Sequence, residues 1–207
     1  MNQLWLTVLA GVAICALLAL PVQLLTGLLL HQRGIDGQMP RRHFWILLSC
    51  LAVVGGVIGW RAGFTLRGAY LVLLLFVAAC AFYIDARNRI IPNELVLAIL
   101  VLAAAFGLTG QIPFQIGSSL LGLAACFVLF FLPSVFGRSI GAGDVKLAAA
   151  MVFTLGLTGS LYAIVGMGVL VLGYVLVSSN LHFSERLKQT IPMGPFLTVA
   201  LVAVSVL

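Results

Sequence analysis

Apolar residues in this chain come in long, unbroken runs. The first extends from Leu4 to Leu30, which exceeds the stretch of about 20 residues that a helix needs to cross the hydrocarbon core of a bilayer. Because the runs are continuous and do not alternate with polar residues, a transmembrane β-barrel is excluded and a bundle of helices is expected. Charged residues make up only 8% of the chain, whereas a soluble domain has roughly 25%.

The polar segments are too short to form a soluble domain, since the longest runs only from His31 to His43. Residues 1–207 are therefore expected to form one all-α, polytopic transmembrane helix bundle. A cleaved signal peptide is not expected, because Met1-Asn2-Gln3 has no basic residue and the first apolar run is too long.

About eight spans are predicted, most of them bounded by proline, glycine or arginine. Pro21 is expected to kink the first span. The stretch 144–179 is too long for one ordinary helix, and we divide it at 155–160, where glycine and serine favour a tight turn. The predicted spans are 4–30, 44–60, 67–84, 93–110, 114–132, 144–157, 160–179 and 192–207.

The basic residues predict the orientation. With eight spans, one side of the membrane receives nine of the eleven: Arg33, Arg41, Arg42, Arg87, Arg89, Arg138, Lys146, Arg186 and Lys188. Only Arg61 and Arg67 fall on the other side. The positive-inside rule makes the nine-residue side cytoplasmic, so both termini are expected outside. This topology accounts for the net charge of +6, and it implies a lipid bilayer as partner without any nucleic acid.

No metal site or disulfide framework is predicted. All four cysteines lie inside apolar runs, with no two at metal-ligand spacing, which favours small buried hydrophobes. His31 and His43 flank the first polar loop but stand twelve residues apart beside two arginines, and His182 is expected in a loop.

Acidic residues are scarce, and two of them stand at the ends of membrane-length segments. Asp85 closes one span and Asp144 opens another, and the topology puts both on the cytoplasmic side. A carboxylate beside the hydrocarbon is costly, so its default interpretation is functional. Two aspartates that can meet are sufficient to hydrolyse a peptide bond by general acid–base catalysis.

Each aspartate also has a structural interpretation. Asp85 could pair with Arg87 or Arg89 in the headgroup layer, and Asp144 could serve as the N-cap of the helix that follows it.

The neighbours of Asp144 allow similar alternatives. Gly141 and Gly143 lack a Cβ, so another backbone, such as an extended substrate, could come close to this loop. Lys146 could support the aspartate pair, although on a helix it would point away from Asp144, and it could equally anchor in the headgroups.

These residues resemble the GxGD-type intramembrane aspartic proteases and, more narrowly, the bacterial prepilin peptidases, also called type IV leader peptidases. The segment 141–147 is similar to one family motif, with Val145 where Phe is more usual, and Asp85 followed by 91–93 is similar to the other. Residues 191–196 resemble the family's Pro-x-Gly-Pro segment. The resemblance covers roughly 67–207, the expected catalytic core.

The resemblance implies a multi-pass aspartic endopeptidase of the bacterial inner membrane, with Asp85 and Asp144 as its catalytic pair. Its substrates would be prepilins or type II secretion pseudopilins, whose short basic leaders are removed at the cytoplasmic face. One ionised aspartate takes a proton from water while the other, protonated, hydrogen-bonds the scissile carbonyl. Two close carboxylates cannot both ionise cheaply, so the pair titrates as a unit. The sequence leaves open which aspartate is the base.

One departure from the family pattern is informative. Many members carry a zinc-binding insert with two Cys-x-x-Cys pairs after the first span, and they also N-methylate the new amino terminus with S-adenosylmethionine. Here 31–43 occupies that place and contains no cysteine. Cleavage is therefore expected without N-methylation and without a metal or cofactor.

Two other classes of function are weighed. An ion- or proton-coupled transporter could use the two aspartates, but transporter sites usually lie near the bilayer midplane in repeated halves. A non-catalytic membrane assembly subunit would not need two acids at converging helix ends.

Overall fold

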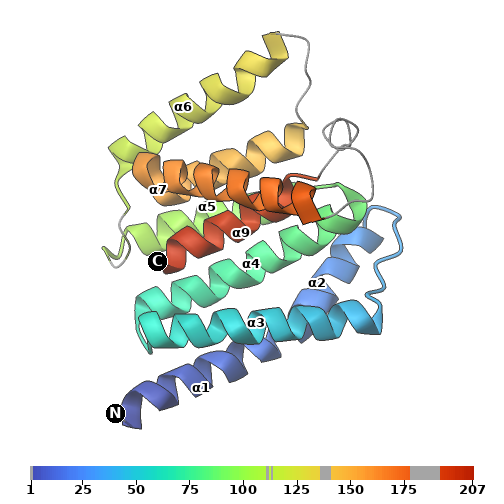
Figure 1. Ribbon diagram of the computed structural model, residues 1–207, viewed down its shortest axis with the longest axis vertical. Helices are drawn as coiled ribbons and strands as arrows, with labels where there is room; N and C mark the ends of the chain where they lie inside the picture. The colour runs from blue at the N-terminus through green and yellow to red at the C-terminus, as the bar shows by residue number, and fades with distance from the viewer. Residues whose placement is uncertain (1, 111, 113, 136–140, 178–191) are drawn as a thin grey trace.

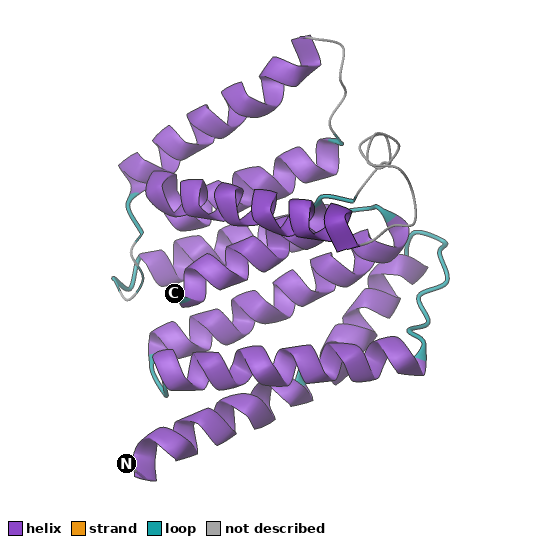
Figure 2. Ribbon diagram, in the orientation of Figure 1, coloured by secondary structure: helices purple, strands orange, loops and turns teal. Residues whose placement is uncertain are grey.

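The structure is a computed structural model, and it describes residues 2–110, 112, 114–135, 141–177 and 192–207. The described residues form helices joined by short loops and turns, with no strand among them (Figure 2). The helices are α1 (Asn2–Leu17), α2 (Ala19–His31), α3 (Arg41–Arg61), α4 (Leu66–Asn88), α5 (Asn93–Gly107), α6 (Ile116–Val135), α7 (Ala142–Val177) and α9 (Gly194–Val206). The predicted all-α bundle is confirmed.

Four stretches are long and apolar enough to cross a membrane: Gln3–His31, Arg41–Arg61, Leu66–Asn88 and Ala142–Val177. Shorter apolar helices lie between them and after them. Large apolar side chains cover the outside of the bundle as well as its core, with Leu24 74% exposed and Val53 69% exposed. This all-round apolarity suits a lipid environment.

Pro21 has the predicted effect on the first span. It has no N–H to offer the carbonyl four residues earlier, and its ring crowds that carbonyl. The helix accordingly divides at Leu18, between α1 and α2, which run in different directions (Figure 1).

α7 is two helices that meet at Gly156, as the turn signals at 155–160 predict. Gly156 has φ 68° and ψ −175°, which no helix contains. The chain turns back there, so that the two halves of α7 run in opposite directions (Figure 1). α6 supports the break, because Ser118 Oγ accepts a hydrogen bond from the Leu157 N–H at 2.9 Å and Ser119 Oγ donates one to the Phe153 carbonyl at 2.9 Å.

Glycines bring α1 and α3 together. Gly11 of α1 faces Gly55 and Gly59 of α3 so closely that the backbones touch, with no space for a Cβ on any of the three. This close approach is the ordinary bundle contact that small residues permit in membranes. Gly166 and Gly168 of α7 make no such contact, since nothing lies within 4 Å of their Cβ positions.

The cysteines are free, and Cys15, Cys80 and Cys126 are buried as predicted. Cys50 is exposed, so the expectation of burial was wrong for this residue, which lies on the outer face of α3.

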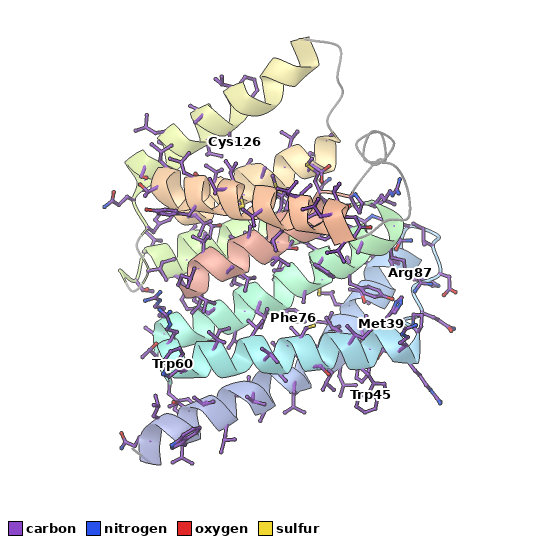
Figure 3. All side chains as sticks on the ribbon, in the orientation of Figure 1. Met39, Trp45, Trp60, Phe76, Arg87 and Cys126 are labelled. Carbon is purple, nitrogen blue, oxygen red and sulfur yellow. The ribbon has the colours of Figure 1, made fainter. Side chains whose placement is uncertain are left out.

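The remaining helices place the aspartates. α9 packs against both α4 and α7, and α5 also contacts both. The C-terminal end of α4 lies at the same end of the bundle as the N-terminal ends of α5, α7 and α9, while both chain termini lie at the opposite end (Figure 1). In Figure 3, Arg87 lies at the end where α4 finishes, and Trp60 lies at the end of the chain termini. Of the predicted basic cluster, Arg138, Arg186 and Lys188 fall outside the described residues.

Candidate active site

Asp85 lies in the last turn of α4 and is buried, with 4% of its surface exposed. The helix ends just beyond it, where Arg89 adopts a left-handed conformation with φ 55° and its N–H bonds the Asp85 carbonyl at 2.9 Å. The turn that follows ends at Pro92, which has no N–H and suits the start of α5.

The predicted alternative for Asp85, an ion pair with a neighbouring arginine, is wrong. Arg87 turns to other partners, donating to the Gln38 carbonyl at 2.6 Å and to the Tyr83 hydroxyl at 3.0 Å. Arg89 lies near the Asp85 carboxylate without pairing with it, since the one salt bridge among the described residues joins Arg33 and Glu94. Asp85 Oδ2 is buried and has no hydrogen-bond partner in the described part of the chain.

Asp144 lies in the first turn of α7 and is partly buried. The helix begins at Ala142, so Asp144 is not its N-cap and that prediction was wrong. The Gly141 carbonyl accepts the hydrogen bond of the Val145 N–H at 3.2 Å, which means that the loop has already become helical before the aspartate. An acidic side chain in this first turn is favoured by the helix dipole.

The two carboxylates lie close enough for their charges to interact. They come from helices that pack on the same two neighbours, α5 and α9, and the charge of Asp85 acts directly on Asp144. α5 and α9 therefore hold the aspartates of α4 and α7 within electrostatic range of each other at one end of the bundle.

Gly141 and Gly143 have close neighbours that leave little space for a Cβ. A Cβ on Gly143 would lie 3.2 Å from Ile91 Cβ, in the turn after Asp85. A Cβ on Gly141 would lie 3.1 Å from Asp144 Oδ2. Gly143 therefore lies close to the Ile91 side chain, and the approach of a substrate backbone to this loop stays a prediction.

Lys146 is exposed and points to α5, where its Nζ donates to Asn93 Oδ1 at 3.1 Å. This bond joins the start of α7 to the start of α5. Glu94, the next residue of α5, accepts two hydrogen bonds from Arg33 at 3.0 and 2.7 Å. The α2–α3 connection and the first turns of α5 and α7 are thus tied together near the aspartates.

Sequence reasoning missed the residue that touches Asp85 most closely, Gly194 at the start of α9. Its backbone N–H lies near enough to the Asp85 carboxylate to act on it electrostatically, and a Cβ there would lie only 2.7 Å from Asp85 Cγ. The signal was present in the Pro192-Met193-Gly194-Pro195 segment, but nothing in the sequence says which helix this segment meets. Within the described residues, no three His, Cys, Asp or Glu side chains gather in a way that could hold a metal ion.

The comparisons agree with this arrangement. The model of the type IV leader peptidase family matches residues 71–176, a segment that contains Asp85 and Asp144. The chain is 30% identical over 159 residues to a prepilin leader peptidase/N-methyltransferase of Pseudomonas aeruginosa, a match that covers 72% of this chain and 53% of the relative. It is 32% identical over 165 residues to a protein of the same name from Xanthomonas campestris pv. campestris, covering 74% and 54%.

The chain spans about half the length of the curated relatives it matches. No solved structure matches it. Since the family model covers more than half of the sequence and both aspartates that the fold brings together, the chain belongs to the type IV leader peptidase family.

Proposed function

We propose that this protein is a membrane-embedded aspartic endopeptidase that removes the leader peptides of prepilins or pseudopilins. The observation that supports the proposal is the position of Asp85 and Asp144 within electrostatic range of each other at one end of an apolar bundle, inside the segment that matches the leader peptidase family. A pair at the end of the bundle suits a substrate whose apolar helix lies in the membrane and whose leader stays in water. It is less suited to a transporter site, which usually lies near the midplane.

The two carboxylates have complementary roles in this proposal. The ionised member takes a proton from the attacking water, and the protonated member hydrogen-bonds the scissile carbonyl. The proton then passes to the leaving amine, and the pair returns to its singly protonated state. Because the two groups share one proton, they act and titrate as a unit.

The site is proposed to face the cytoplasm of a bacterial inner membrane, with both termini in the periplasm. Support comes from Arg33, Arg41, Arg42, Arg87 and Arg89, which belong to the connections at the aspartate end of the bundle. Arg61 and Arg67 belong to the opposite end.

The test of the catalytic pair uses Asp85→Asn and Asp144→Asn, which keep the shape of each side chain and remove its acid. Each variant is co-expressed with a prepilin, and loss of the leader is followed by gel mobility. We expect each to lower the cleavage rate by at least about 100-fold, and the double variant to be little worse than either single one. Asp36→Asn, in the exposed loop before α3, is the matched control and should cleave normally. Near-normal cleavage by either site variant would remove that residue from the pair.

We also propose that cleavage occurs without N-methylation. The curated relatives are named N-methyltransferases as well as peptidases, but the α2–α3 connection of this chain is short and contains no cysteine. The mature pilin amino terminus is analysed by mass spectrometry with this protein as the sole peptidase. An added mass of about 14 Da that depends on this protein would contradict the proposal, and an unmodified amine in a sample with proven cleavage would support it.

A further inference from the structure

The N-terminal end of α9 abuts the Asp85 carboxylate, and it can do so only because residue 194 is glycine. Gly194 is buried and begins the helix. A Cβ on it would lie 2.7 Å from Asp85 Cγ and 3.0 Å from Asp85 Cβ, and it would contact Oδ2 more closely still. Contacts under 3.0 Å are not tolerated by real Cβ atoms, so any side chain at this position would displace the carboxylate or the helix.

The contact is chemically specific. The first N–H groups of a helix have no acceptor within the helix, and they form its positive end. Pro195 has no N–H, so Gly194 supplies the donor at this point of α9. This helix end lies against a buried carboxylate, 4% exposed, whose Oδ2 has no hydrogen-bond partner among the described residues.

The other charged groups around Asp85 can be named. α9 carries no titratable side chain. α7 contributes Asp144, whose carboxylate interacts with that of Asp85, and Lys146, which bonds Asn93. The end of α4 contributes Arg89.

Groups on the other neighbouring helices are engaged elsewhere. Arg87 bonds the Gln38 carbonyl and the Tyr83 hydroxyl, and the His43 ring of α3 packs edge-on against Tyr83 at 6.2 Å between centroids. On α5, Glu94 is paired with Arg33. Gly194 is therefore the residue that lies directly against the Asp85 carboxylate from the side of α9, with its N–H nearby.

We propose that Gly194 is a positioning residue of the peptidase: its missing side chain and its backbone N–H seat the Asp85 carboxylate against the start of α9, at the place where it meets Asp144. This inference rests on the proposed peptidase function. It assigns a structural cause to the orientation of one member of the pair, and it predicts that changes at the start of α9 alter the chemistry of a residue on α4.

The experiment measures the pH dependence of kcat/KM for prepilin cleavage by the purified full chain. Gly194→Ala pushes the carboxylate away from the donor, so the ionised pair loses stabilisation. We expect kcat/KM to fall about 10- to 100-fold at neutral pH and the acid-side limb of the profile to move to higher pH by about one unit. Gly166→Ala is the matched control, because nothing lies within 4 Å of its Cβ position and its profile should match the wild type.

A second variant acts in the opposite direction and adds no bulk. Pro195→Ala provides one more free N–H at the same helix end, so the acid-side limb should move to lower pH. The position of the limb does not depend on how much of the sample is folded, and damage to the fold would not produce shifts of opposite sign. The proposal is overturned if Gly194→Ala is active with a wild-type profile, or if Gly194→Ala is inactive and Pro195→Ala leaves the limb unmoved. A wild-type chain that fails to cleave prepilin would instead count against the proposed function.

Discussion

The contact between α1 and α3 leads to a sharp prediction about stability. A Cβ on Gly55 would overlap the backbone carbonyl of Gly11 and the Cβ of Cys15, and it would lie 2.8 Å from Cys15 Sγ. Two of these three neighbours cannot rotate away, because one is backbone and the other is a Cβ fixed to it. In Gly55→Ala, α1 must therefore retreat by roughly 1 Å along much of its contact with α3.

The cost follows from what holds membrane helices together. Helix association in a bilayer relies on van der Waals packing, so separating two closely packed backbones loses the main source of attraction. Overpacking of this kind typically costs about 1–3 kcal/mol. The gain in helix propensity from replacing glycine by alanine, up to about 1 kcal/mol, offsets only part of it.

The assay is thermal unfolding of the purified protein in detergent. Gly56→Ala is the matched control on the same helix, because its Cβ would meet only the Val12 Cγ2 methyl at 3.1 Å, which can turn aside. We expect Gly55→Ala to unfold at a clearly lower temperature and Gly56→Ala to equal or exceed the wild type. Gly11→Ala should resemble Gly55→Ala, and the double variant should be less unstable than the sum, because both changes disturb one contact. Equal melting of Gly55→Ala and the wild type would refute this account of the α1–α3 interface.

Three further predictions test other parts of the structure. In a background without the four natural cysteines, single cysteines are labelled in intact cells with an impermeant thiol reagent. Gln32→Cys should stay unlabelled, and Phe64→Cys should be labelled, because Phe64 is 74% exposed and lies at the opposite end of the bundle. The reverse pattern would refute the orientation. Gly156→Ala should lower the unfolding free energy more than Gly110→Ala. Both glycines have positive φ, which costs an alanine about 1–2 kcal/mol at either position, but only at Gly156 would the new Cβ also meet a side chain, at 2.8 Å. Equal losses in chemical denaturation would contradict this prediction. Arg33→Ala should lower the unfolding free energy by less than about 1 kcal/mol in the same measurement, because the salt bridge of Arg33 with Glu94 is exposed to solvent. A larger loss would contradict the small contribution expected of this salt bridge.

The helical bundle was predictable because long apolar runs can satisfy their backbone in a bilayer only as helices, and four described stretches are long enough to cross a membrane. The helix breaks near Pro21 and at Gly156 were also predictable, because each residue disfavours a regular helix locally. The shared end of Asp85 and Asp144 followed from counting spans, without knowledge of how the helices pack.

Which helices touch could not be predicted. α9 is apolar on all its faces, so its sequence does not reveal which side meets α4 and which meets α7. The contact of Gly194 with Asp85 was missed for this reason. The cap assigned to Asp144 was wrong because Ala142 and Gly143, which read as loop residues, adopt helical conformations. The Lys146 side chain points to Asn93 of another helix. Sequence spacing does not show that these two residues lie close together.

The position of α9 between α4 and α7 has a consequence for biosynthesis. Asp85 belongs to a helix that is synthesised and inserted long before α9, so its carboxylate first meets the membrane without the N–H of Gly194. During that interval the bundle holds a costly acid that its neighbours have not yet accommodated. Docking of α9, which packs on both α4 and α7, ends this state. A nascent chain that has not yet inserted α9 thus lacks the contact of Gly194 with Asp85, so the surroundings of this carboxylate are completed only with the last helix.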